Sequence, residues 1–277
     1  MELLDKITDY KSDFITVPKT FENYKWFNPI LVFIIGFIIT FIGMFIIEGL
    51  LHITGLKACT DPIVQDIIGT FTLCVFIPAV YIGSKIVEKR PFSSLLNLKM
   101  KWNWSIYFKT LAVSFIVFIV ICAIQSLLNG AQINNKLTII TFLLILIVIP
   151  FQAFAEELVF RGFAMQSLGS WFKIPIVAIV IQALIFGVLH LYDVLGLFDV
   201  IVAGLIYGFV AWYFDGLEVS SAIHAVNNII VSLTTGLGLA ASTTSTTFED
   251  MLVSFIIMVV VVVVLLILDK KCDWFSS

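Results

Sequence analysis

Charge is scarce in this 277-residue chain: Asp, Glu, Lys and Arg together make up only 13% of it. A soluble globular domain carries about 25%. Apolar and aromatic residues make up 60% of the chain, and the mean hydropathy is +1.09. This composition excludes a disordered chain and almost every water-soluble globule. A net charge of −3 also argues against a basic surface that binds nucleic acid. We therefore expect the chain to lie in a membrane and to contact membrane lipids.

Cysteine and histidine are few as well, with four Cys and three His residues. The cysteines lie far apart, and none has the spacing of a zinc site or a redox pair; they are Cys59, Cys74, Cys122 and Cys272. A disulfide framework is not expected in a chain of this size. No H-E-x-x-H pattern occurs either, so the sequence lacks the common zinc-protease helix.

Long apolar runs fill most of the chain, and they are continuous rather than alternating as in membrane strands. About 20 apolar residues are needed for a helix to cross a bilayer. The sequence therefore predicts an all-α, polytopic transmembrane helix bundle of about eight spans. The expected spans are Pro29–Leu51, Ile63–Val87, Ile106–Leu128, Leu137–Leu168, Pro175–Leu191, Leu197–Phe214, Val219–Leu233 and Met251–Leu268.

The positions of the positive charges support this count. With the N-terminus inside the cell, all 16 Lys and Arg residues except Lys57 and Lys136 fall on the inner side. Cytoplasmic loops are enriched in these residues. We therefore expect a multi-pass protein of the cell membrane with both termini in the cytoplasm.

Ionisable residues inside the spans are functional candidates because a charge within a bilayer is costly. They are concentrated between Glu156 and Asn228. Adjacent Glu156 and Glu157 project about 100° apart on a helix. Glu157 and Arg161 have the i, i+4 spacing of an ion pair, which leaves Glu156 free to act. His224 and Asn228 are also four apart and share a helix face, so a membrane-embedded polar site is expected.

One acid, two imidazoles and a carboxamide suit hydrolysis. A carboxylate and a histidine can deprotonate water, and a second histidine and an asparagine can donate hydrogen bonds to an oxyanion. The same Glu156, His190 and His224 could instead bind zinc with an open position. The residue types alone leave both mechanisms open.

Three patterns carry these residues in chain order: Glu156-Glu157-x-x-x-Arg161, Phe186-x-x-x-His190 and His224-x-x-x-Asn228. Together they resemble the CPBP family, the CAAX-protease and bacteriocin-processing intramembrane endopeptidases, which include CAAX prenyl protease 2 and lysostaphin-resistance-protein-A-like (Abi) proteins. The resemblance implies that Glu156 and His190 activate water, and that His224 and Asn228 stabilise the oxyanion. It also implies supporting roles for Glu157, Arg161 and Phe186, and no metal cofactor, with zinc as the alternative.

The resemblance implies an intramembrane endopeptidase that cleaves a membrane-associated peptide or protein, of CAAX type or in peptide or bacteriocin processing. A non-proteolytic bacteriocin-immunity or sequestering protein is the alternative. A transporter is disfavoured because the polar residues lie in one half of the chain. The expected organisation is a cytoplasmic segment (1–28), N-terminal transmembrane helices (29–136), a catalytic core (137–235), and a loop, last span and tail (236–277).

Overall fold

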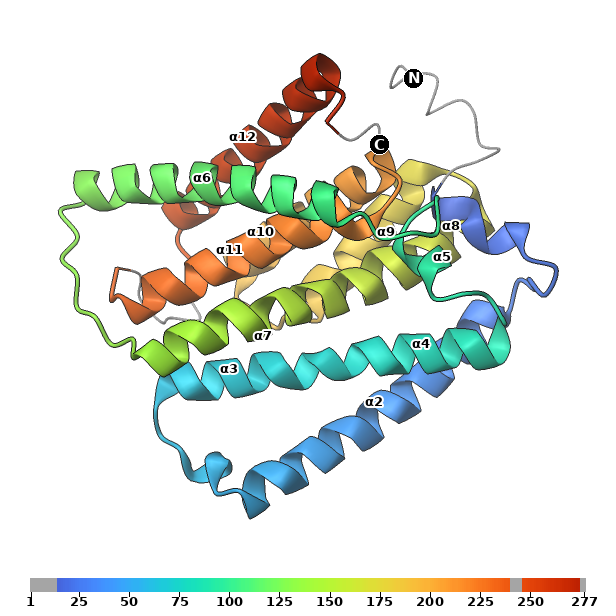
Figure 1. Ribbon diagram of the computed structural model, residues 1–277, viewed down its shortest axis with the longest axis horizontal. Helices are drawn as coiled ribbons and strands as arrows, with labels where there is room; N and C mark the ends of the chain where they lie inside the picture. The colour runs from blue at the N-terminus through green and yellow to red at the C-terminus, as the bar shows by residue number, and fades with distance from the viewer. Residues whose placement is uncertain (1–13, 240–245, 275–277) are drawn as a thin grey trace.

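The computed structural model describes residues 14–239 and 246–274, and this part of the chain is built from helices that lie side by side (Figure 1). It contains no β-strand in these ranges, only an isolated bridge between Asn97 and Gly216. The prediction of an all-α polytopic helix bundle is confirmed.

The elements follow one another along the chain with short connections. They are η2 (Phe14–Thr20), α2 (Asn28–Ile53), η3 (Leu56–Ala58), α3 (Pro62–Thr72), η4 (Leu73–Val75), α4 (Phe76–Val87), α5 (Ser93–Leu96), α6 (Trp104–Leu128), α7 (Ile139–Glu157), η5 (Leu158–Met165), α8 (Gln166–Phe172), α9 (Pro175–Val188), α10 (Val194–Tyr213), α11 (Leu217–Gly236) and α12 (Phe248–Cys272).

Several helices begin at side chains that satisfy the first backbone N–H groups. Asp61 accepts hydrogen bonds from the start of α3, where Pro62 occupies the first turn. Thr138 and Thr247 form capping boxes at the starts of α7 and α12. Because the first turn of a helix has no internal acceptors for its N–H groups, these polar residues define where the apolar helices start.

Six of the eight expected spans are long and apolar enough to cross a membrane by length and composition, within the residues described. The two exceptions are α9 and α11. Helix α9 has 14 residues, which at about 1.5 Å per residue is too short for a ~30 Å hydrocarbon core. Helix α11 has 20 residues but carries serines, a histidine and asparagines. The expected number of about eight spans thus includes two helices that do not meet these criteria of length and composition.

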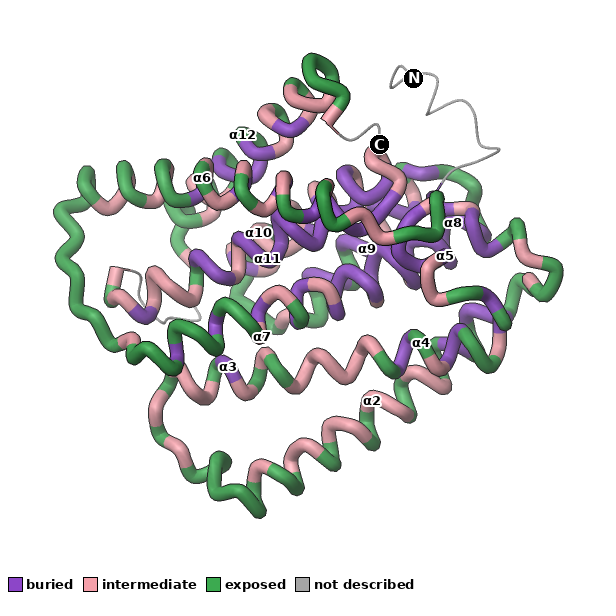
Figure 2. The backbone as a smooth tube through the Cα atoms, in the orientation of Figure 1, coloured by how far each residue is buried: buried purple, intermediate pink, exposed green. Residues whose placement is uncertain are grey.

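The polar composition of α11 follows from its position at the centre of the bundle. Every residue of α11 from Leu217 to Val226 is buried, and the helix packs against α6, α7 and α10. Figure 2 shows this buried centre in purple, whereas the outer helices are largely pink and green. The exposed face of α2 carries Phe33, Phe37 and Phe41, as expected for a surface in contact with lipid. Because α11 faces protein rather than lipid, it does not need an apolar surface.

The first turn of α11 is held by the segment that precedes α6. The Glu218 carboxylate accepts hydrogen bonds from the Asn97 side chain at 2.6 Å and from the Asn103 backbone N–H at 2.9 Å. Glu218 is only 4% exposed. The bridge between Asn97 and Gly216 strengthens the same contact. These contacts fix the start of α11 in place. They thereby help to position His224, which lies about two turns further along the same helix.

A second buried polar cluster ties the segment after α4 to α8. Arg90 donates to Glu88 and to Gln166, both at 2.6 Å, and Gln166 donates to the Ser94 carbonyl oxygen at 3.0 Å. Burial lowers the pKa of the Arg90 guanidinium, and the adjacent Glu88 carboxylate opposes that shift. Arg90, expected from the sequence only as one of the inner positive charges, is thus part of the folded interior.

Part of the expected N-terminal segment (1–28) also belongs to the folded core. Residues 1–13 lie outside the described ranges. In η2, Phe14 and Ile15 are fully buried, and η2 packs against α8. A Cβ atom at Gly169 of α8 would lie only 2.6 Å from the backbone oxygen of Ile15, so the glycine allows this close approach.

Candidate active site

The first polar motif lies where α7 passes into the π-helical segment η5. Glu156 and Glu157 are the last two residues of α7, and Arg161 lies in η5. Short π-helical segments are rare and are frequently found at functional sites. A Cβ atom at Gly162 would lie 2.8 Å from the Leu95 carbonyl oxygen, so this glycine lets η5 pack directly on α5.

Glu157 and Arg161 form the ion pair that their spacing predicts. Arg161 Nη1 lies 2.8 Å from Glu157 Oε1, and both side chains are 0% exposed. Arg161 Nη2 also donates to the Gly204 carbonyl oxygen of α10 at 3.2 Å, and its guanidinium lies 4.5 Å from the centre of the Phe186 ring of α9. The arginine thus ties η5 to both neighbouring helices.

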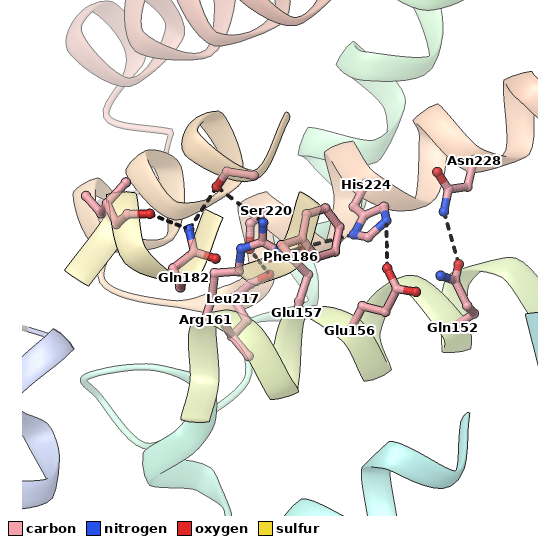
Figure 3. A network of polar contacts seen from close by, with 12 residues as sticks. Gln152, Glu156, Glu157, Arg161, Gln182, Phe186, Leu217, Ser220, His224 and Asn228 are labelled. Carbon is pink, nitrogen blue, oxygen red and sulfur yellow. Dashed lines mark hydrogen bonds and ion pairs between the residues drawn. The ribbon is translucent and has the colours of Figure 1, made fainter. Parts of the chain in front are cut away.

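His224 lies between the two glutamates (Figure 3). Its Nδ1 lies 2.9 Å from Glu157 Oε1, and its Nε2 lies 3.5 Å from Glu156 Oε2. Its ring stacks on the Tyr207 ring of α10, with centroids 4.8 Å apart and planes 15° apart. The two carboxylates diverge from α7 as expected, yet one imidazole reaches both because its nitrogens lie on different edges of the ring.

Asn228 lies one turn further along α11 and contacts a different residue of α7. Its Nδ2 donates to Gln152 Oε1 at 3.1 Å. Gln152 precedes Glu156 by four residues, so the two side chains share a helix face. Helices α7 and α11 are therefore joined by two successive polar contacts, Glu156 with His224 and Gln152 with Asn228.

His190 lies beyond the end of α9, not within a helical span as the sequence led us to expect. Helix α9 ends at Val188, and His190 occupies the turn that follows. Its Nδ1 lies 2.7 Å from the Phe186 carbonyl oxygen, and its ring meets the Phe186 ring edge to face at 4.5 Å. The Phe186 ring also meets the His224 ring edge to face, at 6.0 Å, so both histidines lie against the same phenylalanine.

The structure therefore brings together Glu156, Glu157, Arg161 and His224, with Asn228 one turn further along α11 and His190 against the Phe186 ring. In the described ranges, no hydrogen bond or ion pair joins His190 directly to the other proposed catalytic residues. The alternative zinc set of Glu156, His190 and His224 does not form a ligand cluster: residues 14–239 and 246–274 contain no group of three or more His, Cys, Asp or Glu suited to a metal ion.

Two residues of this site, Gln152 and Tyr207, lie outside the three sequence motifs. Gln152 is only 5% exposed and contacts Asn228. Its spacing of four from Glu156 was the available signal, because residues four apart share a helix face. Tyr207 is 1% exposed, stacks on His224, and has a buried hydroxyl with no hydrogen-bond partner among the described residues. Only the tertiary contact of α10 with α11 reveals its place.

Comparisons with known proteins agree with the three motifs. Residues 136–230 match the family model described as Type II CAAX prenyl endopeptidase Rce1-like, and this segment contains all three patterns. The match confirms the resemblance to the CPBP family that the motifs indicate.

A protein of Bacillus subtilis (strain 168), described as uncharacterized protein YyaK, is 29% identical over 190 residues. The alignment covers 63% of this chain and 62% of the relative, so the chain spans less than two thirds of the curated relative it matches. No solved structure matches the chain.

Proposed function

We propose that this chain is an intramembrane endopeptidase that hydrolyses a peptide bond of a membrane-associated peptide or protein with a water activated by Glu156 and His190. The main observation in support of the proposal is the environment of the Glu156 carboxylate. Its Oε2 is buried and has no hydrogen-bond partner among the described residues, yet it lies 3.5 Å from His224 Nε2. Because a buried oxygen without a partner is costly, such an atom calls for a functional explanation.

His190 has the hydrogen bond expected of a neutral general base. The Phe186 carbonyl oxygen near Nδ1 can only accept, so Nδ1 is the donor, and in the neutral ring Nε2 then holds the lone pair. Glu156 and His190 then share the task of removing a proton from water as its oxygen attacks the carbonyl carbon. The same proton passes to the leaving amine nitrogen when the C–N bond breaks.

His224 and Asn228 are the proposed donors to the oxyanion. The buried cluster of Glu156, Glu157 and Arg161 carries one net negative charge when all three are ionised. To act as an oxyanion donor, the His224 imidazole has to carry a proton on both ring nitrogens, with Nδ1 donating to Glu157. Nε2–H is then available to an oxyanion, and the Asn228 amide supplies a second N–H. Each such donor contributes about 3–4 kcal/mol at the strong end.

The choice of substrates to test is supported by the family description, which concerns CAAX prenyl endopeptidases. A prenylated peptide that ends in Cys-aliphatic-aliphatic-X is therefore the first substrate to test, and an unprenylated membrane peptide is the second. We propose that both termini of this cell-membrane protein lie in the cytoplasm and that no metal ion is required.

Purified protein tests the proposal with two internally quenched peptides, a farnesylated Cys-aliphatic-aliphatic-X peptide and its unprenylated counterpart. We expect the wild type to cleave at least one, and Glu156→Gln to lower kcat by about 10²–10⁴-fold because a general base is lost. Glu48→Gln is the matched control, since Glu48 pairs with Lys57 at a site 45% exposed and far along α2. Equal rates for the wild type and Glu156→Gln would overturn the proposal.

A further inference from the structure

The contact between Gln152 and Asn228 is the feature of the site that none of the three motifs explains. Figure 3 shows it beside the Glu156–His224 pair, with both contacts crossing from α7 to α11. Gln152 is almost fully buried on a helix that is otherwise apolar from Phe142 to Ala155. A buried amide is costly unless it is hydrogen-bonded, and here its partner is the asparagine proposed to bind the oxyanion.

The Asn228 carboxamide is held at both of its polar atoms. Asn227 Nδ2 donates to Asn228 Oδ1 at 2.9 Å, and Asn228 Nδ2 donates to Gln152 Oε1 at 3.1 Å. The three amides thus form a chain that runs in one direction. Hydrogen bonds in such a chain polarise one another, so the Asn228 N–H groups become stronger donors.

Without this chain, little would determine which way the Asn228 amide faces. The terminal torsion of an asparagine side chain is broad and roughly two-fold, so the oxygen and nitrogen can exchange places by rotation. An oxygen facing a developing oxyanion would repel it, whereas an N–H would stabilise it. The acceptor on α7, Gln152 Oε1, therefore decides whether the Asn228 amide stabilises or repels the oxyanion.

We propose that Gln152 is a positioning residue that holds the Asn228 carboxamide in the orientation needed to donate to the oxyanion. This inference rests on the proposed function and adds a residue to it. Since the oxyanion develops only in the transition state, loss of the orientation lowers kcat and leaves KM nearly unchanged.

The test compares Gln152→Met with the wild type on whichever quenched peptide is cleaved. Complete loss of an oxyanion donor costs about 10²–10³-fold in kcat, so we expect a loss of about 10- to 100-fold with KM within about twofold. Gln166→Met is the matched control, because Gln166 is also a buried glutamine that accepts a hydrogen bond across the bundle, from Arg90. Its kcat per folded molecule should equal that of the wild type.

A second comparison separates positioning from an independent effect. In an Asn228→Ala background, Gln152→Met should lower kcat no further, since the group that it positions is gone. An equal loss in both backgrounds, or a change confined to KM, would overturn the inference. If Gln152→Met does not fold, Asn227→Ala removes the other end of the amide chain at a half-buried position and should give the same pattern.

The contact itself is tested without activity by thermal unfolding of the two single variants and the double variant. If the two substitutions, Gln152→Met and Asn228→Ala, change the melting temperature non-additively, the contact is supported. Additive changes would contradict it. A wild type that cleaves neither peptide would count against the proposed function, whereas a cleaving wild type with an unaffected Gln152→Met variant would count only against the role of Gln152.

Discussion

Replacing Arg161 with Met would leave the Glu157 carboxylate buried without its positive partner. In the structure the guanidinium makes a 2.8 Å ion pair with Glu157, a 3.2 Å hydrogen bond to Gly204 and a stacking contact with Phe186. Methionine fills similar apolar space but supplies none of the polar contacts. His224 would remain as the nearest group able to balance the charge.

The expected loss of stability is large because both partners are 0% exposed. Breaking a buried pair by removing one partner costs about 3–5 kcal/mol. For a chain of this size each kcal/mol lowers the melting temperature by about 2–4 °C, so the expected decrease is about 6–20 °C. An exposed pair is worth only about 0–1 kcal/mol. Lys57→Met breaks such a pair, with Glu48, and should shift melting by less than about 4 °C.

Thermal melting of the purified protein, followed by tryptophan fluorescence, measures both changes. Adding Glu157→Gln to Arg161→Met should recover at least half of the lost melting temperature, because the uncompensated charge is then removed. The glutamine oxygen can still accept from His224. The reasoning is refuted if Arg161→Met melts no lower than Lys57→Met, or if Glu157→Gln destabilises the Arg161→Met protein further.

Three further predictions concern parts of the structure around the site. Glu218→Ala removes the acceptor for Asn97 at the start of α11, and should cost about 1–3 kcal/mol in thermal melts; an unchanged melting temperature would show that this contact is unimportant. Gly162→Ala places a Cβ 2.8 Å from the Leu95 oxygen and should cost about 1–3 kcal/mol in the same assay, whereas a stabilised variant would contradict the packing. Chelation should leave peptide cleavage unchanged; stoichiometric zinc whose removal abolishes activity and whose return restores it would overturn the metal-free mechanism.

The helical architecture and much of the site follow from local patterns in the sequence. Apolar runs predict the spans, and the spacing of four predicts the contact between Glu157 and Arg161. The three motifs also place acid, imidazole and amide groups in one third of the chain. These features can be predicted from the sequence because they depend on helix periodicity and on the energetic cost of a charge in a bilayer.

Contacts between segments far apart in the chain could not be predicted in this way. Helix α11 is tolerant of polar residues because other helices surround it, which no local hydropathy reveals. Arg90 and Glu218 are drawn into the interior by partners on distant segments. Gln152 and Tyr207 join the site through α11 and α10, so their roles depend on packing rather than on any motif.

The most direct test of the central claim compares the membrane peptides of cells that carry the wild-type protein with those of cells that carry Glu156→Gln at the same membrane level. A water activated by Glu156 predicts that specific shortened peptides disappear in the variant and that their longer precursors accumulate, with no change in the variant's melting temperature beyond a few degrees. Identical peptide populations in the two strains would contradict the account.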